Sequence, residues 1–125
     1  MSNIEKTNFY NYFLPDSYIQ EIKINSDKVE IDIYWEVKKK IIKIICQEVV
    51  GITDLCMWED SIIGDNVCLK EVDYSSNDFL IRVYNAHPYV CDCGKTLRDR
   101  LLQLSIELTN NISFCVYCYR VMVEE

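Results

Sequence analysis

The feature that most constrains the fold is an alternation of apolar and polar residues over 29–36. Val29, Ile31, Ile33 and Trp35 are apolar, and the residues between them are acidic or carry a hydroxyl group. Because successive side chains of a strand point to opposite faces, this pattern predicts a strand with one face in the core. An amphipathic helix would instead repeat its apolar residues every three or four positions.

The same period, or a dense run of β-branched residues, recurs along most of the chain. Turn-forming residues at 25–28 and 110–111 separate neighbouring runs, the lysines at 38–40 end the strand described above, and Gly64 begins a turn or a β-bulge. Further strands are therefore predicted at 22–24, 41–46, 49–58, 67–71, 102–108 and 112–123.

Two segments need a choice between helix and strand. Residues 77–86 have apolar residues at helical spacing, a capping Ser76 or Asn77 and a terminating Pro88, so they predict one short helix. Residues 96–110 have helical propensity, but Leu102, Leu104, Ile106 and Leu108 alternate strictly with polar residues. We therefore predict that this segment is a strand and forms a β-hairpin with the C-terminal strand.

The chain has 125 residues, half of them apolar, which is enough for one core and one domain spanning residues 1–125. The predicted fold class is α+β and mainly β, an antiparallel sheet or sandwich of about seven strands with one helix. The sequence contains one histidine and three glycines, so it carries no His-Glu-x-x-His zinc motif and no glycine-rich phosphate loop. No catalytic constellation is visible, and we predict a protein that is not an enzyme and has no cofactor.

The net charge of −7 comes from one quarter of the chain. Residues 48–78, called here the acidic segment, contain eight acidic residues and Lys70 as the only base. The remaining acids and bases balance. Such a charge disfavours nucleic acid or an anionic membrane as a partner and favours a basic protein.

Within the acidic segment, Trp58 is the candidate anchor of an interface with a charged rim. The alternative is that Trp58 belongs to the core and that the acids only form a solvated face. The predicted partner-binding residues are Asp54, Trp58, Glu59, Asp60, Asp65, Glu71 and Asp73.

The seven cysteines are an odd number and cannot all pair within one chain. Residues 1–6 show no signal peptide, so we expect reduced thiols and a cytosolic protein. No metal site is predicted, because Cys91 and Cys93 are too close in sequence for usual zinc spacing and Cys115 and Cys118 point to opposite faces of a strand. The weak candidates for metal or redox chemistry are His87, Cys91, Cys93 and Cys118.

Two stretches carry a resemblance to a known class of proteins. They are Leu-Pro-Asp-Ser-Tyr-Ile at 14–19, which leads into a hairpin, and Gly-Ile-Thr-Asp-Leu-Cys-Met-Trp-Glu-Asp-Ser-Ile-Ile at 51–63. Over residues 12–123 the chain resembles small β-rich immunity proteins of bacterial polymorphic toxin loci. The resemblance implies that the protein binds and blocks a cognate toxin in the cytosol, and it transfers no contact residue.

We therefore expect a cytosolic binding protein that occludes a toxin, for example a nuclease, with its acidic segment. Two alternatives stay open. One is a metal-binding or redox-responsive domain that uses His87, Cys91 and Cys93, and the other is a non-catalytic subunit of a larger assembly.

Overall fold

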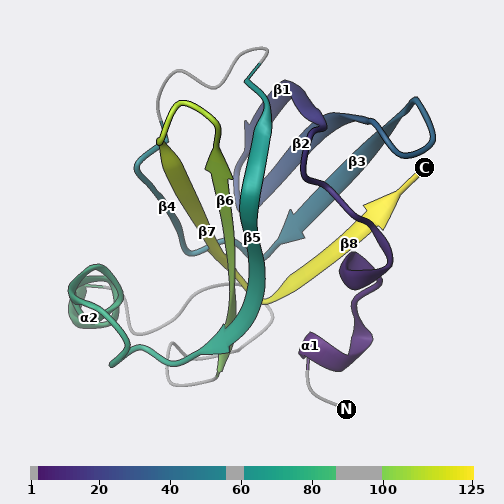
Figure 1. The fold of residues 1–125 in the computed structure, drawn as a ribbon. Coiled ribbons are helices and arrows are strands. Elements are labelled where there is room, and N and C mark those ends of the chain that lie inside the picture. The colour runs from purple at the N-terminus through teal and green to yellow at the C-terminus, as the bar shows by residue number, and fades with distance from the viewer. Residues whose placement is uncertain (1–2, 56–60, 87–99) are drawn as a thin grey trace.

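The computed structural model describes residues 3–55, 61–86 and 100–125, and these residues form two packed antiparallel sheets (Figure 1). The predicted class, α+β and mainly β, is confirmed. Sheet A has the strand order β1 (Tyr18–Asn25), β2 (Lys28–Trp35), β3 (Lys40–Gln47), β8 (Arg120–Glu124). Sheet B has the order β4 (Gly51–Thr53), β7 (Ser113–Cys118), β6 (Leu101–Leu108), β5 (Ile63–Val72).

The core lies between the inner faces of the two sheets. The four apolar residues predicted to share one face of β2 are all buried. On β6, the alternating residues Leu102, Leu104, Ile106 and Leu108 are also buried and belong to the same core cluster. The prediction of a strand at 102–108 is therefore confirmed, because burial on one sheet face offsets the local preference for a helix.

The predicted C-terminal hairpin is present as the pair β6–β7, but its second strand is shorter than predicted. The chain leaves sheet B at Tyr119 and continues as β8 in sheet A. The Tyr119 N–H donates to the carbonyl of Gln47 at 3.2 Å, and the Val50 N–H donates to the carbonyl of Tyr117 at 2.8 Å. The ribbon formed by 40–53 and 115–124 thus turns the corner between the sheets as one unit, which residue alternation does not encode.

Several local predictions can be compared with the observed elements. Gly64 begins a β-bulge, since the pairing of β5 with β6 shifts register between Ile63 and Val67. Helix α2 (Asp78–Ala86) starts after Asn77, whose side-chain oxygen accepts a hydrogen bond from the Leu80 N–H at 2.9 Å. The strand predicted at 49–58 is too long, since of its described residues only Gly51–Thr53 form a strand, β4; residues 56–58 lie outside the described part of the chain.

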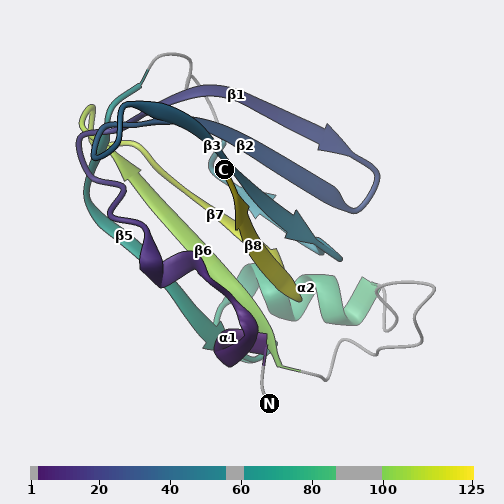
Figure 2. The same cartoon turned by 90° about the vertical axis from the view of Figure 1, so that its right-hand side faces the viewer.

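The N-terminal segment, residues 3–17, closes one side of the sandwich and was not predicted to be structured. It contains helix α1 (Asn3–Lys6) and the 3₁₀ turn η1 (Phe9–Asn11), and it runs between the edges of β5 and β8 (Figure 2). The Asn8 side chain donates to the carbonyl of Val123 at 2.9 Å and accepts from its N–H at 2.8 Å. The segment therefore satisfies the edge of β8 where another strand would otherwise pair.

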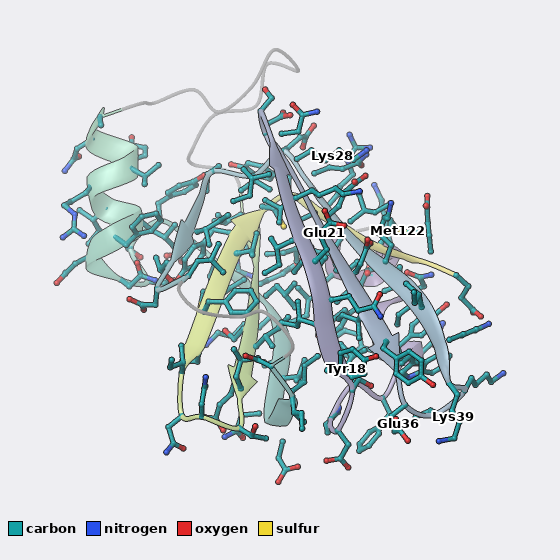
Figure 3. All side chains as sticks on the ribbon, turned by 90° about the horizontal axis from the view of Figure 1, so that it is seen from above. Tyr18, Glu21, Lys28, Glu36, Lys39 and Met122 are labelled. Carbon is teal, nitrogen blue, oxygen red and sulfur yellow. The ribbon has the colours of Figure 1, made fainter. Side chains whose placement is uncertain are left out.

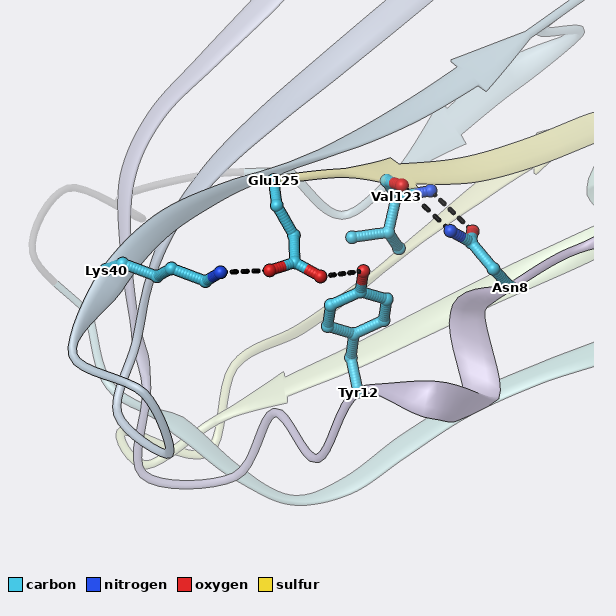
Figure 4. A network of polar contacts seen from close by, with 5 residues as sticks. All are labelled: Asn8, Tyr12, Lys40, Val123 and Glu125. Carbon is cyan, nitrogen blue, oxygen red and sulfur yellow. Dashed lines mark hydrogen bonds and ion pairs between the residues drawn. The ribbon is translucent and has the colours of Figure 1, made fainter.

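The same segment is tied to the end of the chain by a second polar contact (Figure 4). The Tyr12 hydroxyl donates to the Glu125 carboxylate at 2.8 Å, and Lys40 pairs with the other oxygen of that carboxylate. These hydrogen bonds lower the pKa of Glu125 below its ordinary value, with the bond from Lys40 as the larger cause.

Helix α2 packs on the outer face of sheet B through apolar contacts. Leu80 is fully buried, and the Phe79 ring stacks on Tyr117 with ring centroids 5.5 Å apart. Gly51 allows this close approach, because a Cβ atom at this position would lie 2.3 Å from Phe79 Cζ and the ring would have to move. None of the helices in the described ranges is long and apolar enough to cross a membrane.

The outer face of sheet A carries a mixture of charged, aromatic and apolar side chains. Tyr18, Glu21, Lys28 and Met122 point away from sheet B (Figure 3). Tyr18 stacks on Tyr34 of the neighbouring strand with ring centroids 5.1 Å apart. Lysines and glutamates on this face form ion pairs within β1 and within β2, and Lys43 of β3 pairs with Glu30 of β2, so the face has no single charge sign.

Candidate functional site

The acidic segment is divided between two edges of sheet B. Asp54 follows β4, whereas Asp65 and Glu71 belong to β5, and β6 and β7 lie between these edge strands. Three strand spacings correspond to about 14 Å. The acids of this segment that have described positions therefore do not form one continuous patch. The predicted Trp58, Glu59 and Asp60 lie outside the described residues.

The four described candidates also divide between the two ends of the sheet. Because β4 and β5 run in opposite directions, the end of β4 and the start of β5 lie at the same end (Figure 1). Asp54 and Asp65 thus belong to that end, called here the bulge end. Glu71 and Asp73 lie at the opposite end, beside helix α2, called here the helix end.

At the helix end, both acids are engaged within the protein. Glu71 accepts a hydrogen bond from Arg100 at 3.4 Å. Asp73 accepts from the Ser75 hydroxyl and, at 2.9 Å, from the Ser75 N–H, which fixes the turn between β5 and α2. These two hydrogen bonds, the hydroxyl first, lower the pKa of Asp73 below its ordinary value.

At the bulge end, both acids are exposed. Among the residues with described positions, neither Asp54 nor Asp65 takes part in an ion pair. Asp54 has a positive φ of 61°, a backbone conformation that Asp tolerates better than most residues. Asp65 lies inside the β-bulge, which turns it out of the regular strand pairing. Of the four described candidates, these two carboxylates are therefore the ones available to a partner.

A hollow of about 190 Å³ lies beside Asp65. Tyr10 and Phe13, which contribute to its wall, are 61% and 63% exposed, a large fraction for aromatic residues. The residues that line this hollow, called here the bulge-end hollow, are Phe9, Tyr10, Tyr12, Phe13, Leu14, Pro15, Asp65 and Val67.

A second hollow of about 320 Å³ lies beside Asp73, between the β5–α2 turn and the helix. Tyr74, Ile81 and Tyr84 give it largely apolar walls, and Ser75 contributes to its rim. The Tyr74 hydroxyl lies 3.0 Å from the buried hydroxyl of Tyr119. This helix-end hollow is the larger of the two, and the carboxylate beside it is already used by its own turn.

The structure brings Cys118 together with Cys46 rather than with another predicted ligand. Both cysteines are fully buried, Cys46 on sheet A and Cys118 on sheet B. A hydrogen bond with Cys46, followed by burial, raises the pKa of the Cys118 thiol well above its ordinary value. Because zinc binds the thiolate, a thiol held in its protonated form is a poor ligand.

The other candidates for metal or redox chemistry, His87, Cys91 and Cys93, fall outside the described ranges. Within residues 3–55, 61–86 and 100–125, no three His, Cys, Asp or Glu side chains lie close enough to hold a metal ion.

The bulge-end hollow was missed at the level of sequence. Its walls come from a run in which four of the five residues 9–13 are aromatic. The run has no helical or strand period, so it was not assigned to any element. The available signal was a dense aromatic run outside every predicted helix and strand, since aromatic residues are enriched where proteins bind one another.

No protein family model, curated protein sequence or solved structure matches this chain.

Proposed function

We propose that this chain is a cytosolic protein-binding domain that neutralises a basic toxin, as the immunity proteins that its sequence resembles do. The observation that supports the proposal is the arrangement at the bulge end. Two exposed carboxylates, Asp54 and Asp65, flank an end of sheet B that also carries an exposed aromatic hollow. Aromatic anchors with a charged rim are the usual composition of a protein interface.

The mechanism of such a protein is occlusion. A nuclease toxin holds phosphate with a basic surface, and an acidic protein competes for that surface. The charge of −7 attracts the toxin over a long range and speeds the encounter. Short-range contacts of the aromatic side chains then slow dissociation. Neither step needs a cofactor or a catalytic residue.

The test of this function uses the product of the neighbouring gene. We expect its expression alone to arrest growth and co-expression with this chain to restore growth, and we expect the two purified proteins to form a complex. A neighbour that is a metabolic enzyme and does not bind would overturn the proposal. Binding without neutralisation would also overturn it, in favour of a subunit of a larger assembly.

Two double variants with the same change of charge locate the surface. Asp54→Asn with Asp65→Asn should slow association about tenfold at low salt and flatten its salt dependence. Glu71→Gln with Asp73→Asn removes the same two charges at the helix end and should leave association within about twofold of the wild type. Equal effects of the two variants would show that only the net charge matters.

Trp58 provides a separate test within the same segment. As an interface anchor, Trp58→Ala should weaken the complex by about 2 kcal/mol or more, mostly through faster dissociation. The free energy of unfolding of the variant is measured alongside. A variant that loses several kcal/mol of stability instead would show that Trp58 is a core residue.

A further inference from the structure

We infer that the bulge-end hollow receives one cationic side chain of the partner, an arginine, which stacks on its aromatic wall and pairs with Asp65. This inference rests on the proposed function for the identity of the partner as a basic protein. It adds the site, the chemical class of the bound group and the residues that recognise it.

The size of the hollow fits a single side chain. Pockets for small-molecule ligands usually measure about 300–1,000 Å³. The bulge-end hollow, at about 190 Å³, is smaller than this range. A long side chain that enters from a partner surface matches this volume better than a free cofactor does.

The chemistry of the lining selects a cation. Aromatic rings attract a positive charge over their faces, and a guanidinium group also stacks on them. Asp65 adds a carboxylate that can accept two parallel hydrogen bonds from arginine. None of the described residues that line the hollow is basic, so no internal cation competes for Asp65 there. An apolar occupant would desolvate Asp65 without pairing it, which is unfavourable.

Much of the wall of the hollow is held in place by the fold. The Trp35 indole N–H donates to the carbonyl of Phe13 at 2.8 Å, and the Tyr12 ring lies against the Trp35 ring with centroids 4.9 Å apart. The Tyr10 hydroxyl donates to the carbonyl of Leu69, and its ring meets Phe9 edge-on at 5.7 Å. The parts of the wall that are already held, the Tyr10 and Tyr12 side chains and the Phe13 main chain, lose little conformational entropy when a side chain binds.

The helix-end hollow is less suited to bind a cation than the bulge-end hollow. Its walls are Tyr74, Ile81 and Tyr84, and the Asp73 carboxylate beside them already accepts hydrogen bonds from its own turn. A cation placed there would compete with Ser75 for the carboxylate. The two hollows therefore differ in the availability of their acid rather than in the presence of one.

The experiment uses N-acetyl-L-arginine amide as the probe and N-acetyl-L-citrulline amide as its uncharged analogue. Amide and aromatic NMR spectra of the full chain are recorded during titration with each probe. We expect arginine to shift the signals of Tyr10, Phe13 and Asp65 in a saturable way and citrulline to leave them in place. Equal shifts with both probes, or no shifts, would overturn the inference.

Matched variants assign the recognition to the proposed residues. Asp65→Asn should weaken arginine binding at least about fivefold, whereas Asp54→Asn, the same change on the other edge, should weaken it less than about twofold. Phe13→Leu keeps an apolar side chain but removes the ring, and should weaken binding about two- to fivefold. An equal loss in both Asn variants would show unspecific attraction to the acidic surface and would overturn the inference.

Two further results separate this inference from the proposed function. If the Asp65→Asn and Phe13→Leu variants each neutralise the neighbouring gene product as well as the wild-type chain does, the arginine site is wrong and the proposed function stands. If the probe binds as expected but no basic protein is neutralised, the site stands and the proposed function is wrong. Free L-arginine that binds more than about tenfold tighter than the blocked probe would indicate a small-molecule site and would overturn the assignment to a partner side chain.

Discussion

Two segments cover the sandwich, and they are held in different ways. The N-terminal segment is attached by hydrogen bonds to strand edges, such as those of Asn8 with Val123, in addition to the burial of Phe9 and Leu14 in the core. Helix α2 is attached mainly by apolar packing of Leu80 and Phe79. Each segment leaves a hollow beside an acid of the acidic segment, Asp65 or Asp73, and of these two acids only Asp73 accepts hydrogen bonds from described residues of its own turn. A carboxylate that fixes its own turn is a structural group, whereas an exposed one beside an aromatic wall is available for recognition.

The largest expected effect is on the apolar attachment of α2. Leu80→Ala removes a fully buried side chain and should lower the free energy of unfolding by about 2–5 kcal/mol. Urea unfolding measures the change. Ile81→Ala, at the exposed neighbouring position, should cost less than about 1 kcal/mol. Similar losses in the two variants would contradict the view that α2 is held by the buried side of the helix.

The next effect tests how closely the Phe79 ring of α2 packs on Gly51 of sheet B. Gly51→Ala places a methyl group where the Phe79 ring lies and should cost about 1–3 kcal/mol. Gly64→Ala is the matched control, since its nearest neighbour, the carbonyl oxygen of Glu107, would be 3.4 Å away. The control should change stability by less than about 1 kcal/mol in either direction. A Gly51→Ala protein as stable as the control would show that the helix can shift freely.

The polar attachment of the N-terminal segment is tested at Asn8. Asn8→Ala removes two hydrogen bonds to the edge of β8 and should cost about 1–3 kcal/mol. Hydrogen exchange should also show a less protected Val123 amide, because its acceptor is gone. Asn11→Ala changes an exposed asparagine of the same segment and should cost less than about 0.5 kcal/mol. An unchanged Val123 amide in Asn8→Ala would show that the segment is held by its apolar residues instead.

The smallest expected effect is on how the stability depends on pH, through Asp73 beside the helix-end hollow. Hydrogen bonds from Ser75 lower the pKa of Asp73 in the folded state below its ordinary value, so its contribution to stability is present above that ordinary value. The contribution is lost as the pH falls through the folded-state pKa. Asp73→Asn should therefore flatten the acid limb of the stability curve, measured by urea unfolding from neutral pH to about pH 3. An unchanged limb would show that the turn does not depend on the Asp73 charge.

Part of the fold and part of the site could be predicted from local pattern. The strands at 29–35 and 102–108, the bulge at Gly64 and the cap at Asn77 each depend on residues close together in sequence. Among the candidate acids, sequence identified Asp65 but gave it the same weight as Asp73. The difference between them depends on their surroundings, because Asp73 accepts hydrogen bonds from Ser75 of its own turn, while Asp65 lines a hollow together with aromatic residues of the N-terminal segment.

The sequence by itself determined which faces are apolar and where the net charge lies, because alternation and composition act within a few residues. Only the tertiary structure decided how the charge is distributed, since β4 and β5 are neighbours in sequence but lie on opposite edges of sheet B. It also decided that the segment 112–123 contributes one strand to each sheet. In addition, it decided that Asn8 forms hydrogen bonds with the edge of β8 at Val123, 115 positions away. These outcomes depend on which strand edges pair when the core forms. The free energy that favours this pairing comes from contacts along the whole chain and not from any one segment.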